Sequence, residues 1–122
     1  MPSSQVREIF EVWNQALQSG NARQVADLYA ETPVLLPTLS NQVCTDRRQV
    51  EDYFSAFLLR QPRARLDVSH ERIFDDLIIH SGLYTFLLQA ENRAIQVRFT
   101  FVYQWLKDRW QILEHHSSRM PE

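Results

Sequence analysis

Residues 94–120, AIQVRFTFVYQWLKDRWQILEHHSSRM, decide the fold of this chain. Two runs within them, 95–106 and 109–118, are rich in aromatic and β-branched residues, which are typical of strands on a half-buried surface. The polar pair Lys107-Asp108 separates the runs and suits a tight turn. We therefore predict that the two runs pair as an antiparallel hairpin.

Composition indicates one globular domain over residues 1–122, with 44% hydrophobic residues and 11% aromatic ones. The net charge of −2 offers no basic field for nucleic acid. No run approaches the roughly 20 apolar residues that span a bilayer, and the N-terminus lacks the apolar core of a signal peptide. We therefore expect a cytoplasmic protein. The one cysteine, Cys44, excludes an internal disulfide, and the sequence leaves its reactivity open.

Upstream of the hairpin, apolar residues recur at helical spacing in three segments and at strand spacing in three others. Asn21 and Asp46 are suited to cap the second and third helices. We expect helices up to Ser19 and over 21–30 and 46–60, and strands over 34–36, 65–74 and 78–89, before the hairpin. This order predicts an α+β fold with a mostly antiparallel sheet.

Three helices cannot all lie flat on a narrow sheet. Long twisted strands can instead curl around the helices into a cone. Such a cone has a natural pocket between the helices and the concave face of the sheet.

Several motifs resemble the cone-shaped NTF2-like superfamily, in which three N-terminal helices pack on a curved sheet. The ending WQILEHHSSRMPE is similar to the end of the calcium/calmodulin-dependent protein kinase II association domain and of small stand-alone bacterial proteins in that group and in the SnoaL-like group. The other matching motifs are Ser19-Gly20-Asn21, Leu36-Pro37, Tyr53-Phe54, Gly82 with Tyr84 and Phe86, and the run RFTFVY at residues 98–103.

The resemblance implies a fold more firmly than an activity, because this fold hosts isomerases, dehydratases, hydrolases, binding modules and pure oligomerisers. The association domain is known for arginines that line its pocket. The matching positions here are Tyr84, Phe101 and Ser117, so the resemblance does not imply an anion-binding pocket of that kind.

Strand alternation sorts the hairpin into two faces. Phe99, Phe101 and Tyr103 share one face with Trp105, which we place under the helices. If Trp110 and Ile112 of the second run face the core, strict alternation predicts that three polar residues further along also point inward. These are Glu114, His116 and Ser118.

Glu114 and His116 are the candidate catalytic pair, because a carboxylate beside an imidazole suits acid–base chemistry near neutral pH. A structural polar cluster explains the pair equally well. Aromatic or polar groups that would line the pocket form the candidate ligand-binding set: Tyr53, Tyr84, Phe101, Tyr103 and Ser118. We expect His80 to be a histidine at the surface or at a sheet edge.

We expect no metal, because the neighbours His115 and His116 point to opposite faces of a strand and no other ligand set accompanies them. No nucleotide-binding fingerprint indicates a cofactor. Strict alternation puts His115 on the outer face of the sheet, with Arg98, Thr100 and Val102. Related cone proteins dimerise through this face, so the resemblance implies a homodimer; a monomer with a solvated face is the alternative.

The sequence thus favours a protein that binds a small molecule in a largely apolar, aromatic pocket. Acid–base catalysis of the isomerase, cyclase or hydrolase type is left open. The alternative is a non-catalytic association module.

Overall fold

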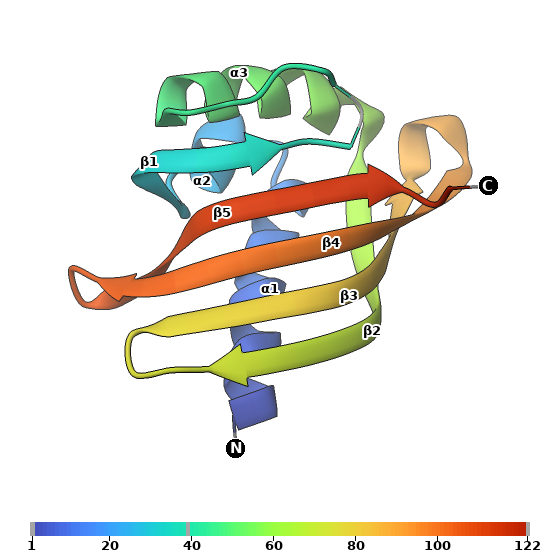
Figure 1. The fold of residues 1–122 in the computed structure, drawn as a ribbon. Helices are drawn as coiled ribbons and strands as arrows, with labels where there is room; N and C mark the ends of the chain where they lie inside the picture. Colours follow the sequence, from blue (N-terminus) through green and yellow to red (C-terminus); the bar gives the residue numbers. More distant parts are fainter. Residues whose placement is uncertain (1, 39, 122) are drawn as a thin grey trace.

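The computed structural model describes residues 2–38 and 40–121, without the side chains of residues 2–4. Figure 1 shows the course of the chain. The helices are α1 (Pro2–Gln18), α2 (Ala22–Ala26), α3 (Arg47–Phe57) and the 3-10 turns η1 (Leu58–Arg60) and η2 (Gln89–Glu91). The strands are β1 (Tyr29–Leu36), β2 (Pro62–Ile73), β3 (Leu77–Leu88), β4 (Arg93–Leu106) and β5 (Arg109–Arg119).

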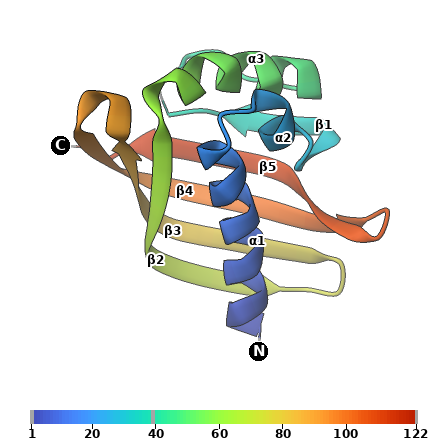
Figure 2. The same cartoon turned by 180° about the vertical axis from the view of Figure 1, so that it is seen from behind.

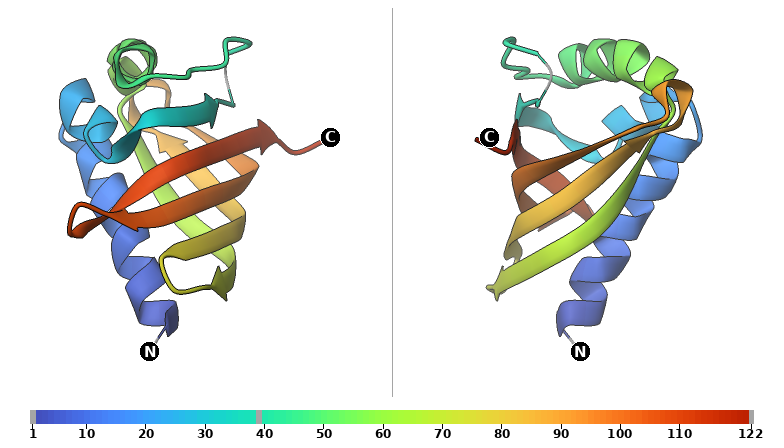
Figure 3. Two further views of the ribbon diagram at one scale, coloured as in Figure 1. Left: turned by 60° about the vertical axis from the view of Figure 1, so that its left-hand side comes forward. Right: turned by 90° about the vertical axis from the view of Figure 1, so that its right-hand side faces the viewer.

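The five strands form one sheet in the order β1-β5-β4-β3-β2. Strand β1 pairs with β5 in parallel, and the other neighbours are antiparallel. Helix α1 runs across one face of the sheet, and α3 lies above its β1 edge (Figures 2 and 3). The curved sheet and its helices confirm the predicted α+β cone. Helix α3 follows β1, in the order expected of segments 34–36 and 46–60, so only α1 and α2 precede all the strands. No helix in the described part of the chain is both long and apolar enough to cross a membrane.

Side-chain caps define where two helices begin, as predicted. Asn21 Oδ1 accepts from the backbone N–H groups of Arg23 and Gln24, at 3.0 and 3.3 Å. Asp46 Oδ1 accepts from the backbone N–H of Gln49 at 2.8 Å. Each cap satisfies N–H groups that the first turn of a helix leaves without partners.

The second helix is shorter and the first strand longer than the sequence pattern predicts. Helix α2 ends at Ala26, and Tyr29 already belongs to β1, where it lies opposite Ile112 of β5. Apolar residues at helical spacing suggested helix up to Ala30. Pairing with β5 and complete burial of the Tyr29 side chain outweigh that local preference.

The β4–β5 turn forms at Lys107 and Asp108, as predicted. Their φ angles are +55° and +63°, the positive values that a type I′ hairpin requires at both central residues. The turn twists in the same sense as the strands it joins, so the hairpin can extend to Arg119.

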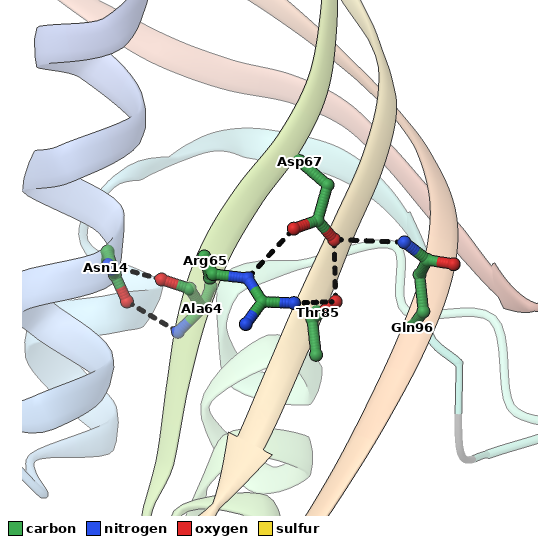
Figure 4. Close-up of polar contacts among 6 residues, drawn as sticks. All are labelled: Asn14, Ala64, Arg65, Asp67, Thr85 and Gln96. Carbon is green, nitrogen blue, oxygen red and sulfur yellow. Dashed lines mark hydrogen bonds and ion pairs between the residues drawn. The ribbon is translucent and has the colours of Figure 1, made fainter.

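Helix α1 is fixed to the sheet by a polar clamp as well as by its apolar face. The Asn14 amide donates to the carbonyl oxygen of Ala64 and accepts from the Ala64 N–H, both at 2.8 Å (Figure 4). Phe10 and Trp13 of the same helix are buried against the concave face. Their ring centroids lie 5.8 and 5.6 Å from that of Tyr84, so aromatic packing fills the centre of the cone.

A β-bulge in β5 controls which side chains reach that centre. Tyr103 of β4 lies opposite Ile112, but the next pair along is Val102 with Glu114. Leu113 is therefore an extra residue on β5, and a bulge of this kind reverses the alternation of faces beyond it. A second register shift, between Leu66 and Val68, has the same effect in β2.

Candidate functional site

Glu114 and His116 are both exposed, on the outer face of the sheet. Their predicted inward orientation is wrong, because that prediction assumed unbroken alternation from Ile112, and the extra residue Leu113 shifts the register by one. Ser118 also lies on the outer side and is half-buried. The proposed catalytic pair therefore has no access to the interior of the cone.

His115 occupies the interior position instead, with only 2% of its surface exposed. Its imidazole stacks on Phe101 and meets the edge of Trp13, with centroid separations of 4.0 and 5.4 Å. Nδ1 lies 2.8 Å from the Tyr29 hydroxyl oxygen, and Nε2 lies 3.2 Å from that of Tyr84. The predicted place of His115 on the outer face is therefore wrong, for the same reason.

The partners of His115 fix the position of its proton. The Trp13 indole N–H can only donate, and it does so to the Tyr29 hydroxyl oxygen at 3.3 Å. Among the described residues, His115 Nδ1 is the one acceptor in reach of the Tyr29 hydroxyl proton. A neutral imidazole whose Nδ1 accepts carries its proton on Nε2. That proton points to the Tyr84 oxygen.

The polar chain continues from Tyr84 to the edge of the molecule. Burial raises the pKa of Tyr84, and the Ser117 side chain, which hydrogen-bonds the Tyr84 hydroxyl, has a smaller, opposing effect. Ser117 is itself buried, and its hydroxyl contacts that of the half-buried Thr38. A row of buried polar groups thus runs from Trp13 through His115 to Thr38. Every link has a partner, as buried polar groups require.

His80 forms a second buried chain, so the prediction of a surface or edge histidine is wrong: its exposure is 0%. Ser69 donates to the Glu71 carboxylate at 2.8 Å, because a carboxylate only accepts. The Ser69 oxygen is then free to accept from His80 Nε2–H at 2.8 Å, and Nδ1 accepts from the Tyr103 hydroxyl at 2.9 Å. A serine that donates to the carboxylate rather than to the histidine is not activated as a nucleophile.

Burial keeps both histidines neutral. It lowers the pKa of His115 to about 3, with a smaller contribution from the charge of His116. Burial likewise lowers the pKa of His80 to about 4, against an opposing effect of Glu71. Burial raises the pKa values of Tyr29 and Tyr103. Such weak bases bind almost no protons near neutral pH, which suits structural hydrogen bonds better than acid–base catalysis.

The predicted ligand-binding residues separate into two groups. Tyr84, Phe101 and Tyr103 point inward and are buried in the aromatic packing. Tyr53 is half-buried on α3 and lines a cavity of about 340 Å³, together with Phe57. The Cys44 thiol borders the same cavity; burial raises its pKa, which makes the reactive thiolate less abundant.

A largely apolar cavity lies between α1 and the β4–β5 hairpin, with a volume of about 440 Å³. We call it the tryptophan groove. Trp13, Trp105 and Trp110 contribute to its lining, and Trp105 meets the edge of Trp110 with 5.5 Å between centroids. The remaining lining residues are aliphatic or polar: Gln5, Glu8, Ile9, Val12, Leu28, Asp108, Arg109 and Ile112. Buried side chains fill the centre of the cone, where the pocket was expected, and the tryptophan groove lies at the hairpin end.

The outer face of the sheet carries Arg98, Thr100 and Val102, on the side where alternation puts them. A polar cluster spans β2, β3 and β4 on this face (Figure 4). Asp67 accepts from the Thr85 hydroxyl at 2.6 Å and from Gln96 and Arg65 at 3.1 and 2.9 Å. Burial raises the pKa of Asp67, but these hydrogen bonds outweigh it and hold the pKa below its ordinary value.

Residues 2–38 and 40–121 contain no group of three or more His, Cys, Asp and Glu side chains that could hold a metal ion. Two histidines, His80 and His115, are interior although the sequence pattern put them at the surface, an edge or the outer face. Trp13 and Tyr29 were not among the candidate site residues. For His80 a signal existed, because it shares a strand face with Tyr84 and Phe86. For His115 the only hint was the pair of successive apolar residues Ile112-Leu113.

Similar solved structures share this fold. A protein from Xanthomonas campestris, assigned to the calcium/calmodulin-dependent protein kinase II association domain, is 44% identical, with a TM-score of 0.93 over 97% of this chain and 87% of that one. An NTF2-like protein of unknown function from Pseudomonas putida is 18% identical, with a TM-score of 0.81 over 94% and 84%. An NTF2-like protein from Streptomyces avermitilis, described as a dehydratase, is 14% identical, with a TM-score of 0.79 over 98% and 97%.

A comparison with curated proteins found no match. The sequence model of the calcium/calmodulin dependent protein kinase II association domain matches residues 3–121, which is nearly the whole described chain. The match agrees with the NTF2-like cone and with the ending that first suggested this group. The chain therefore belongs to the calcium/calmodulin-dependent protein kinase II association domain family.

Proposed function

We propose that this protein binds a small, largely apolar or aromatic molecule in the tryptophan groove. The volume of about 440 Å³ lies within the range of roughly 300–1,000 Å³ that is usual for small-molecule sites. Apolar walls with a few polar groups at the rim are also typical of such sites. Glu8, Asp108 and Arg109 supply those polar groups.

The exposed indole of Trp105 is the observation that carries the proposal. This side chain is 46% exposed, although it packs against Trp110 over a groove with a buried tryptophan, Trp13, in its wall. Each Å² of apolar surface that a ligand covers contributes about 25 cal/mol. A flat apolar molecule in the groove would cover Trp105 together with the exposed Val12.

The test uses N-phenyl-1-naphthylamine, a neutral apolar fluorophore, as the probe. Val12→Arg puts a charge at the wall of the groove, on a side chain that is 52% exposed, so the fold should tolerate it. Val43→Arg is the matched control, since Val43 is 46% exposed and lies outside the groove. We expect Val12→Arg to weaken probe binding at least tenfold and Val43→Arg to leave it unchanged. Equal binding by both variants and the wild type would exclude the groove.

Self-association through the outer face of the sheet is a second candidate function. The apolar residues on that face favour it, because Leu36 and Val68 are exposed and Ile79, Leu83 and Val102 are only half-buried. The Xanthomonas campestris relative is named for an association domain. We place Arg98, Thr100 and Val102 in this interface and omit His115, which is buried inside the cone.

The mass in solution tests this second candidate. Val102 lies opposite Glu114 on the outer face, so Val102→Asp adds a second negative charge to the proposed interface. Light scattering should give a dimer for the wild type and for the control Val43→Asp, and a monomer for Val102→Asp. A monomeric wild-type protein would rule out the assembly, and the solvated face would then be the correct description.

A further inference from the structure

A polar recess lies on the opposite side of the β4–β5 hairpin from the tryptophan groove, with a volume of about 430 Å³. We call it the basic recess. The start of β1, the first residue of α3 and the two ends of the hairpin turn form its walls, and Figure 1 shows these segments on one side of the molecule. Gln104 and Gln111 line it from the outer face of the sheet, whereas Ile112 lines the groove from the inner face.

Three cations and one carboxylate line the basic recess. Lys107 and Glu31 form an ion pair, with Lys107 Nζ 3.1 Å from Glu31 Oε1. The hydrogen bond from Lys107 and the charges of Lys107 and Arg47 hold the pKa of Glu31 below its ordinary value. The carboxylate in the recess is thus already paired, which leaves Arg47 and Arg109 as an excess of positive charge.

Both of these arginines are half-buried, yet no carboxylate of the described residues lies within ion-pair distance of either. Arg47 is held in place by one hydrogen bond from Nε to the Tyr29 carbonyl oxygen at 2.9 Å. The other four N–H donors of its guanidinium have no acceptor among the described residues. The Arg109 guanidinium has no such acceptor either. Partly desolvated charges are costly unless a counter-charge is supplied.

The hairpin base adds neutral groups that are also held in place. Gln111 is buried, and its Nε2 donates to the Leu106 carbonyl oxygen at 2.9 Å. Gln104, directly opposite Gln111 in the β4–β5 register, offers an amide group to the same recess. The site therefore combines a fixed guanidinium, a second arginine and amide donors within one concavity.

We infer that the basic recess binds the oxyanion group, phosphate or carboxylate, of a small molecule. A guanidinium presents paired N–H donors in a planar fork that matches both groups. The volume exceeds that of a bare phosphate, so it accommodates the part of the molecule that bears the anion. None of these cations lies inside the cone. Arg109 borders both cavities, whereas Arg47 lines the basic recess and not the tryptophan groove.

Inorganic phosphate and succinate are the two probes, each titrated at constant ionic strength against chloride and followed by calorimetry and by amide shifts in NMR spectra. The phosphate and succinate arms tell which oxyanion the recess prefers. We expect saturable binding of at least one, with shifts at β1, the start of α3 and the β4–β5 turn. Binding no stronger than that of chloride, or shifts spread over all exposed cations, would overturn the inference.

The adjacent residues Arg47 and Arg48 provide a matched pair of variants. Arg48 is exposed on the same helical turn and lies outside the recess. Arg47→Gln should weaken oxyanion binding at least tenfold, and Arg48→Gln should leave it within twofold of the wild type. Equal loss in both variants would mean binding to general surface charge. If loss of the bond to Tyr29 unfolds the Arg47 variant, Arg109→Gln should weaken oxyanion binding as well; because Arg109 also borders the tryptophan groove, naphthylamine binding of this variant is measured alongside.

The naphthylamine probe separates this inference from the proposed function. Arg47→Gln should bind N-phenyl-1-naphthylamine like the wild type, and Val12→Arg should bind the oxyanion like the wild type. Either proposal can therefore be refuted while the other stands.

Discussion

The imidazole of His115 stacks on the ring of Phe101, with 4.0 Å between centroids and 19° between planes. The contact joins β5 to β4 inside the cone, and hydrogen bonds to Tyr29 and Tyr84 hold the ring at both nitrogens. His115 is thus a neutral polar group that joins its own strand, β5, to β1, β3, β4 and α1. Four predictions follow from this packing, from the second buried histidine and from the bulges.

Tyr29→Phe should destabilise the fold by about 1–3 kcal/mol. It removes the hydroxyl that accepts from Trp13 and donates to His115, and so leaves two buried polar groups without a partner. Thr32→Val on the same strand is the control, because the Thr32 side chain is exposed. Urea unfolding measures both; equal stability of the Tyr29 variant and the wild type would contradict the hydrogen-bond chain.

The protein should lose stability as the pH falls from about 7 toward 4. In the unfolded chain a histidine has a pKa near 6.5, whereas burial lowers the pKa values of His115 and His80 to about 3 and about 4. Below pH 6.5 the unfolded state therefore binds more protons than the folded state, so acid favours unfolding. Each histidine contributes up to about 1.4 kcal/mol per pH unit in this window.

Urea titrations at pH 7, 6 and 5 check this dependence. His115→Gln should have a shallower pH dependence than the wild type, although its stability at pH 7 is lower. His116→Gln should keep the wild-type dependence, because that side chain is exposed. A flat profile for the wild-type protein would contradict the burial of the two neutral rings.

Nitrogen-15 NMR should find His115 and His80 as the tautomer with the proton on Nε2. In His115 the proton position is set by the Trp13 indole, which donates to the Tyr29 hydroxyl oxygen. In His80 it is set by the Glu71 carboxylate, which takes the Ser69 hydroxyl proton and leaves the Ser69 oxygen to accept from Nε2–H. Each ring should show one nitrogen of pyridine type at Nδ1 and one of pyrrole type at Nε2. A proton on Nδ1 of either ring would contradict these hydrogen-bond directions, because the tyrosine hydroxyl at Nδ1 would then have to accept rather than donate.

Gly82→Ala should destabilise the protein severely, by roughly 3 kcal/mol or more, as large steric clashes in a packed region do. Gly82 has a φ of +154°, and an added Cβ would lie 2.0 Å from the Val68 carbonyl oxygen at the β2 bulge. Gly20→Ala is the control: its φ is +73°, but nothing lies within 4 Å of the added Cβ. That change should cost about 1–2 kcal/mol, the usual cost of a left-handed conformation. Thermal melts compare the two; similar losses would argue against the close approach at Val68.

The sequence indicated the elements better than it indicated which way their side chains point. The caps at Asn21 and Asp46 and the Lys107-Asp108 turn are local signals, and each predicted its feature. Apolar spacing found the helices but extended the second one too far, to Ala30. The inward position of His115 depends on a register shift that involves a partner strand. Ile112 and Leu113 are both apolar, so either residue can face the core, and composition alone does not show which one is extra. The aromatic filling of the cone likewise depends on how α1 crosses the sheet.

The extra residue Leu113 also affects how relatives should be compared. The two neighbouring histidines, His115 and His116, have the same side chain but opposite surroundings, and only the bulge decides which one is inside. In a relative without the extra residue, or with the bulge beyond the two histidines, the first histidine would face outward and the second would face the interior. A sequence alignment that pairs the histidines by residue type would then equate an interior position with an exterior one. Functional roles in this family should therefore be transferred by strand register rather than by column.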